Sequence, residues 1–168
     1  MQMYIGESFV GSGANAAHIN IVMGPRDGPV GGAWASALAS PSAGHLPFLA
    51  VLKPGFPTKP PVVFINKAAL VPGNHETMTW GPAQAGVAKG VHECMRDGVL
   101  PAQAADEWCV IAAVWVNPAA DDAEEVYRNN YESTRGAIVA AMRNTPALAD
   151  LEVAAQSIGN PFFTPKQV

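Results

Sequence analysis

Three polar residues in the first half of the chain are of types that move protons or bind polar ligands. His18 lies in an alternating run of residues, Lys67 follows an apolar run, and Gln84 follows Gly81-Pro82. Histidine is the side chain best suited to proton transfer near neutral pH. Lysine can hold an anion, and a glutamine amide can both donate and accept hydrogen bonds. Each is therefore a candidate for catalysis or ligand binding.

The alternating run at residues 17–23 predicts a strand with two different faces. Alternate residues of a strand share a face. Ile19, Ile21 and Met23 then point into a core, whereas His18 and Asn20 share the opposite face. A histidine and an asparagine placed in this way lie within reach of one ligand.

Lys67 and Gln84 are expected at the ends of two further elements. If residues 63–69 are extended, Lys67 and Ala69 share a face of that strand. Gly81-Pro82 is expected to open a helix with Gln84 in its first turn. Free backbone N–H groups there, together with the amide, would form a cradle for an anion or the edge of a heterocycle.

Each candidate also fits an ordinary structural role. A single histidine on a strand is more often a surface or hydrogen-bonded residue, a lysine often caps a strand end in water, and a first-turn glutamine is often solvated. The other histidines have no metal-ligand spacing such as HExxH. The sequence also has no nucleophile elbow, P-loop or dinucleotide-binding fingerprint.

The elements that must position these residues predict an α+β fold. Strands are expected at residues 4–10, 17–23, 48–52, 62–66 (with an extension to 70 left open) and 108–116, and helices at 29–38, 81–97, 101–106 and 121–143. Because they do not alternate strictly, we expect a sheet with helices packed mainly on one face. Residues 1–168 are expected to form a single domain with a loosely organised tail from about residue 146.

Composition narrows the classes of partner. Of the 168 residues, 49% are hydrophobic and 14% charged, which suits a folded core, and the net charge is −4 without a basic run, which argues against nucleic acid. Cys94 and Cys109 are far apart and predict buried free thiols. We find neither a signal peptide nor a long apolar run, so we expect a cytoplasmic protein without membrane contact.

Six stretches of the chain occur in an order typical of one family. They are AHINIVMGPR (17–26), FLAV (48–51), INK (65–67), WGPAQAGVA (80–88), and the pair AADD (119–122) and NYEST (130–134). The chain thereby resembles the formaldehyde-activating enzyme family from about Gly6 to Phe162, which is nearly its whole length.

The resemblance implies a carbon–oxygen lyase (a hydro-lyase) of one-carbon metabolism, as in methylotrophy and formaldehyde detoxification. Such an enzyme condenses formaldehyde with the co-substrate tetrahydromethanopterin and gives methylene-tetrahydromethanopterin and water. It implies no metal and no permanently bound cofactor. It also implies a fold similar to domain 2 of ribosomal protein S5, and a homopentamer with the pterin between neighbouring subunits.

The resemblance also assigns roles to individual residues. His18 aligns with the general acid that protonates the carbinolamine oxygen as water leaves. The ligand-contacting positions of the family align with Asn20, Leu49, Lys67, Ala69 and Gln84. Three of them keep the family's residue, namely Leu49, Lys67 and Gln84.

Two positions depart from the family pattern, since Asn20 replaces an aspartate and Ala69 a threonine. Loss of a charge that stabilises the cationic iminium would cost on the order of 10²–10³ in rate, and loss of the hydroxyl about 1 kcal/mol. Glu7 or a neighbouring subunit can supply a compensating carboxylate. There are two alternatives. One is a pterin- or formaldehyde-binding paralogue acting as sensor or carrier, and the other is an enzyme of the same chemical type acting on another amine, such as tetrahydrofolate, or on a thiol adduct.

Overall fold

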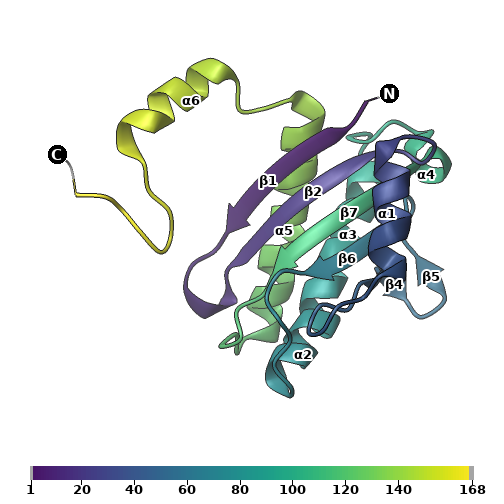
Figure 1. Cartoon of the computed structure of the whole chain (residues 1–168), viewed down its shortest axis with the longest axis horizontal. Helices are drawn as coiled ribbons and strands as arrows, with labels where there is room; N and C mark the ends of the chain where they lie inside the picture. Colours follow the sequence, from purple (N-terminus) through teal and green to yellow (C-terminus); the bar gives the residue numbers. More distant parts are fainter. Residues whose placement is uncertain (1, 167–168) are drawn as a thin grey trace.

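The computed structural model describes residues 2–166 and is built on a five-stranded sheet (Figure 1). The strand order is β1-β2-β7-β6-β3, and neighbours are antiparallel except for the parallel pair β6 and β7. The strands are β1 (Tyr4–Val10), β2 (Ala17–Pro25), β3 (Phe48–Leu49), β6 (Val62–Asn66) and β7 (Trp108–Trp115). A separate ribbon consists of β4 (Val51–Lys53) and β5 (Phe56–Pro57).

The two longest helices, α3 (Gln84–Arg96) and α5 (Ala123–Arg143), lie together behind the sheet in Figure 1. Helix α1 (Pro29–Ala39) crosses one end of the opposite face, and the rest of that face stays open. The shorter helices are η1 (Gly13–Asn15), α2 (Asn74–Met78), η2 (Thr79–Ala83), α4 (Ala104–Glu107), α6 (Leu148–Ala154) and η3 (Ala155–Ser157). The predicted α+β class is confirmed.

The core lies between the sheet and the pair α3 and α5. Ile19, Ile21 and Met23 of β2 are fully buried there, as the alternating pattern predicts. Burying one such side chain stabilises the fold by roughly 1.5–3 kcal/mol. The same alternation leaves His18 and Asn20 half-buried on the open face. Cys94 and Cys109 are buried and free, as predicted.

Gly6 sets the close approach between β1 and α5. A Cβ atom at this position would lie 2.0 Å from the carbonyl oxygen of Ala137, which no real contact allows. Any side chain here would push β1 away from α5. The next residue along β1 is Glu7, so the glycine also fixes where the Glu7 side chain begins on the open face.

The strand predicted at residues 62–66 is confirmed as β6, without the extension to Leu70 that was left open. Two other expectations about element boundaries are wrong. Residues 48–52 are not one buried strand, because Ala50 separates β3 from β4. The helix expected to open at Gly81-Pro82 begins at Asn74, since α2, η2 and α3 follow one another without a break. Pro82 lies inside the π-helical turn η2, whose wider hydrogen bonding accommodates its missing N–H.

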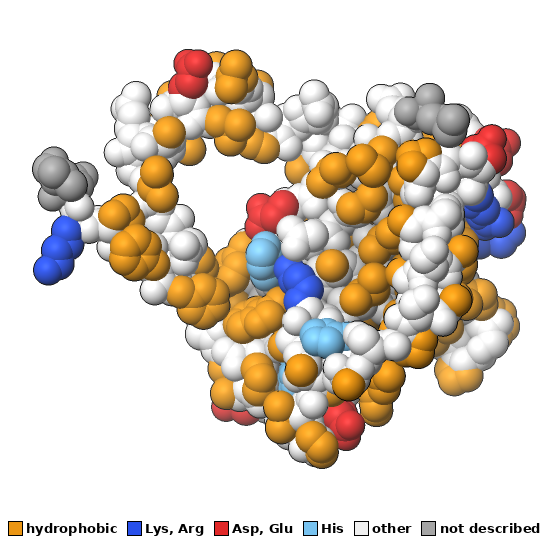
Figure 2. Space-filling model, in the orientation of Figure 1, with side chains coloured by type: hydrophobic (Ala, Val, Ile, Leu, Met, Phe, Trp, Pro, Cys, Tyr) orange, Lys and Arg blue, Asp and Glu red, His pale blue; other side chains and the backbone are white. Residues whose placement is uncertain are grey.

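The chain after α5 forms an exposed arm that stands away from the body, with open space between them in Figure 2. Helix α6 belongs to this arm and exposes Leu148, Leu151 and Val153. The arm returns to the sheet at Phe162, whose ring packs edge-on against Trp115 at 5.9 Å between centroids. Within residues 2–166, no helix combines the length and apolarity that crossing a membrane requires.

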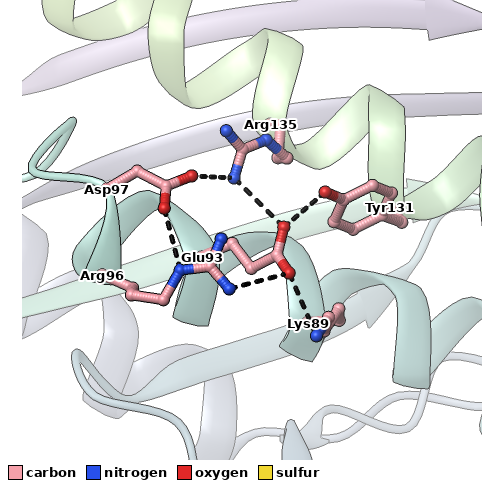
Figure 3. A network of polar contacts seen from close by, with 6 residues as sticks. All are labelled: Lys89, Glu93, Arg96, Asp97, Tyr131 and Arg135. Atoms are coloured by element: carbon pink, nitrogen blue, oxygen red, sulfur yellow. Dashed lines mark hydrogen bonds and ion pairs between the residues drawn. The ribbon is translucent and has the colours of Figure 1, made fainter.

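A polar network joins α3 to α5 on the surface behind the sheet (Figure 3). Its centre is Glu93, which is 8% exposed and accepts a hydrogen bond from the Tyr131 hydroxyl. Lys89 lies 3.0 Å from the same carboxylate, Arg96 3.3 Å and Arg135 3.4 Å. The hydrogen bond from Tyr131, followed by that from Lys89, lowers the pKa of Glu93 to about 2.

We expect Glu93→Gln to lower the midpoint of thermal unfolding at pH 7. A carboxyl with a depressed pKa stabilises the folded state above its ordinary pKa of 4.5, and this stability is lost as the pH falls toward about 2. The gap between the native chain and the variant should therefore narrow between pH 4.5 and pH 2. Glu132→Gln, at an exposed position of α5, is the matched control. A gap that stays constant with pH would contradict the role of the charge.

Candidate functional site

The open face of the sheet carries a row of side chains across four strands. His18 of β2 stands between Phe9 of β1 and Trp115 of β7 in the strand register. Lys67 directly follows Asn66, which pairs with Val114, and so lies at the level of Trp115 on the far side of β7. Because β6 and β7 pair in this parallel register, Lys67 lies at the same level along the sheet as His18, with β7 between them.

Four polar side chains meet on this row. Glu7 Oε1 lies 3.0 Å from His18 Nε2, and Lys67 Nζ lies 3.2 Å from His18 Nδ1. The Lys67 ammonium also donates to Asn20 Oδ1 at 2.8 Å. Figure 2 looks onto this face, where acidic, histidine and lysine side chains adjoin near its centre. The structure therefore places His18 and Asn20 on one face, as the alternation predicts, and brings Lys67 beside them.

The side chain of Lys67 crosses β7 to reach β2. Two strand spacings amount to roughly 10 Å, which requires an extended lysine. On the open face of β7, Trp115 lies at the level of His18, and Ala113 lies between Asn20 and Ile65.

The contacts of His18 define its tautomer. An ammonium group has no acceptor, so Lys67 donates to Nδ1 and that nitrogen carries no proton. Nε2 then carries the proton and donates it to the carboxylate of Glu7. In this arrangement His18 is a neutral imidazole held from both sides by groups of opposite charge.

Burial and charge both act on the titration of this cluster. Burial, and next the Lys67 charge, lower the pKa of His18, while Glu7 acts in the opposite direction. Burial also lowers the pKa of Lys67 to about 8, and the Glu7 charge again opposes it. Near neutral pH the lysine is mostly charged and the histidine mostly neutral.

Asn66 is the last residue of β6, and its hydrogen bonds hold the turn from which Lys67 reaches His18 and Asn20. Its side-chain Nδ2 donates to the main-chain oxygens of Gly44 and Ala68, both at 2.7 Å. The main-chain oxygen of Asn66 accepts from His45 Nδ1 at 2.8 Å. The expectation that Lys67 and Ala69 share a strand face is wrong, because the strand ends before them. Ala69 is exposed and lies beside the loop at Gly44.

Gln84 and Leu49 lie on a different part of the surface. They line a hollow of about 380 Å³ whose wall consists of Leu46, Pro47, Phe48, Leu49, Val51, Trp80 and Gln84. Gln84 Oε1 accepts from the backbone N–H of Val51 at 2.6 Å. The predicted cradle of free N–H groups at Gln84 is wrong, since its N–H bonds to the carbonyls of Gly81 and Thr79.

Two residues of the open face are not assigned to the site by the sequence. Glu7 is only one potential source of a compensating charge in the sequence, and the structure makes it the direct partner of His18. Trp115 falls in a predicted strand but has no predicted place in the site. The alternation of each strand is the signal available, but the register that brings these residues beside His18 cannot be read from alternation alone. Within residues 2–166, no cluster of three or more His, Cys, Asp or Glu side chains is placed to hold a metal ion.

Comparison with known proteins shows the family of the chain. The family model for the formaldehyde-activating enzyme (Fae) matches residues 5–163, which include every candidate site residue. The 5,6,7,8-tetrahydromethanopterin hydro-lyase of Methanosarcina barkeri is 40% identical over 162 residues, covering 96% of this chain and 91% of that protein.

A second relative is longer than this chain. The bifunctional enzyme Fae/Hps of Archaeoglobus fulgidus is 42% identical over 146 residues, covering 87% of this chain but 37% of that protein. The chain thus spans little more than a third of the bifunctional relative, and nearly all of the hydro-lyase. With a family model that matches almost its whole length, the chain belongs to the formaldehyde-activating enzyme family.

Proposed function

We propose that this chain condenses formaldehyde with tetrahydromethanopterin, giving methylene-tetrahydromethanopterin and water, with His18 as the general acid. The observation that carries the proposal is the contact of His18 with Glu7 on one ring nitrogen and Lys67 on the other. Family membership supports the choice of substrates, since the relative in Methanosarcina barkeri is named for this hydro-lyase reaction.

The reaction needs an acid at one defined step. A pterin nitrogen adds to formaldehyde and forms a carbinolamine, whose hydroxyl leaves poorly as hydroxide. Protonation of that oxygen by His18 lets the C–O bond break with loss of water, and a cationic iminium remains until the second nitrogen closes the ring. The lowered pKa of His18 makes its protonated form a stronger acid, although a less populated one, near neutral pH.

The remaining site residues would bind and orient the pterin, which is the co-substrate and not a resident cofactor. Lys67 and Asn20 present an ammonium and an amide beside His18, and Ala69 follows Lys67 by two residues in the chain. Leu49 and Gln84 offer an apolar hollow with one amide. Holding both reactants in place supplies the entropic part of the catalysis.

We propose a homopentamer in which the pterin binds between neighbouring subunits. The two groups of binding residues occupy different parts of one chain, as expected if each pocket takes one group from each subunit. The exposed apolar side chains of the arm and around the hollow also suit burial in an assembly. A cytoplasmic location and a fold of the ribosomal protein S5 domain 2 type belong to the same proposal.

A second candidate function is binding without turnover, as a pterin or formaldehyde-adduct sensor or carrier. The observation that favours it is Asn20, because Lys67 there meets an uncharged amide and not a carboxylate. The exposed Ala69 offers no hydroxyl to a ligand. Both changes can weaken catalysis while leaving a pocket of similar shape.

We expect His18→Ala to reduce the enzymatic rate by on the order of 10²-fold or more, since it removes the general acid. The measurement is a stopped-flow assay of methylene-tetrahydromethanopterin formation, read as the excess over the spontaneous condensation. His92→Ala, at an exposed position of α3, is the control and should keep the native rate. An unchanged rate in a folded His18→Ala variant would overturn the role of His18.

The pH dependence should report the same group. We expect kcat/KM to fall as the pH rises, with a midpoint below the ordinary histidine value of 6.5, because the protonated acid disappears. Lys67→Met keeps a long unbranched side chain but removes a charge that lowers the pKa of His18, so the midpoint should move to higher pH. Lys53→Met, on exposed β4, is the control. An unshifted midpoint in Lys67→Met would show that another group controls the profile.

Calorimetry separates the two candidate functions. If the chain is an enzyme, tetrahydromethanopterin should bind and turn over with formaldehyde. Tight pterin binding with no rate above the spontaneous one would favour the sensor or carrier. Turnover with tetrahydrofolate in place of tetrahydromethanopterin would instead assign the same chemistry to another amine.

A further inference from the structure

The charges of the site do not balance around position 20. Lys67 brings an ammonium group to the open face, and the residue that it meets on β2, Asn20, carries no charge. The proposed reaction passes through a cationic iminium, which an unpaired ammonium nearby would repel. A carboxylate close to His18 is therefore needed to stabilise the cation.

Glu7 is such a carboxylate, and it comes from a different strand. In the register of β1 and β2 it stands directly opposite Asn20, while its Oε1 reaches diagonally to His18 Nε2 at 3.0 Å. Its charge acts on both His18 and Lys67. Its side chain is 57% exposed, so one side of the carboxylate faces the space where a ligand would bind.

The backbone beneath Glu7 is held in place. Gly6 fits against the Ala137 carbonyl of α5 with no room for a Cβ atom, and the whole of β1 pairs with β2. The distance between Glu7 and His18 is therefore set by the sheet and not by a loop. A rigid support of this kind is what a group needs to hold another in a reactive orientation.

We propose that Glu7 is the positioning residue of His18 and the counter-charge of the site, in place of a carboxylate at position 20. It accepts the Nε2 proton of His18, which fixes the ring and its tautomer. Its negative charge also offsets that of Lys67 and of the iminium that forms next to them. This inference rests on the proposed function for its catalytic part, whereas the contact with His18 stands independently of turnover.

The test is a double-mutant cycle in which kcat and KM are measured for the native chain, Glu7→Gln, Asn20→Asp and the double variant. Glutamine keeps an oxygen that can accept from His18 but loses the charge, so we expect Glu7→Gln to lower kcat on the order of 10²-fold with little change in KM. Asn20→Asp alone completes the cycle and is the reference against which the double variant is compared. In the double variant, the new carboxylate at position 20 should restore kcat by roughly tenfold or more over Glu7→Gln. Glu132→Gln is the matched control and should be native-like.

A second readout does not depend on activity. Glu7 and Lys67 are the charged groups that act on His18, and Glu7 raises its pKa. NMR titration of the His18 ring should therefore give a lower pKa in Glu7→Gln than in the native chain, and a recovered one in the double variant. The Glu132→Gln control should leave the titration unchanged, and His18→Gln identifies the His18 signal.

The two readouts separate failure of this inference from failure of the proposed function. A native chain without turnover, but with a His18 pKa that falls in Glu7→Gln, would reject the enzyme and retain Glu7 as the partner of His18. Turnover that survives Glu7→Gln unchanged would overturn the counter-charge. A His18 pKa that does not respond to Glu7→Gln would overturn the positioning contact. A double variant no faster than Glu7→Gln would overturn the claim that Glu7 stands in for a carboxylate at position 20.

Discussion

The whole site depends on one ammonium group that must cross a strand. Lys67 leaves the end of β6, passes over β7 and contacts His18 and Asn20 on β2, where it is half-buried. Burial of a charge is costly unless other groups satisfy it. His18 and Asn20 supply acceptors and Glu7 supplies the opposite charge, so each polar side chain of the cluster is needed by the others.

The fold meets this constraint with features far from the reacting groups. The tight contact of Gly6 with α5 places β1, and the amide of Asn66 turns the chain at the point where Lys67 must leave the sheet. Changes at Gly6 and Asn66 are expected to act on the chemistry without any contact with a substrate.

Most of what the sequence predicted about the open face of the sheet came from the alternation of polar and apolar residues along β2. Alternation placed His18 and Asn20 opposite the core, because burial of Ile19 and Ile21 leaves the intervening residues no other face. Cross-strand register was not available from the pattern, so the pairing of Glu7 with Asn20 and the place of Trp115 had to come from the structure. Local patterns say which way a side chain points, whereas pairing decides which side chains meet.

The errors at Gly81-Pro82 and Ala69 have specific physical causes. Proline near a glycine is a strong signal for a helix start, but a π-helical turn absorbs the missing N–H, and the helix continues through it. Strand β6 ends at Asn66, where the buried amide bonds to two carbonyls outside the sheet, so Lys67 and Ala69 are not on an extended strand. Neither a π-turn nor a buried amide has a reliable signature in one sequence.

The most direct measurement is an NMR titration of the histidine-labelled chain with tetrahydromethanopterin. We expect saturable changes in the His18 ring signal, with the exposed His92 unaffected, because the pterin should bind against the cluster of Glu7, His18 and Lys67. Saturable pterin binding that leaves the His18 signal unchanged would place the ligand elsewhere and contradict the assignment of the open face as the reaction site.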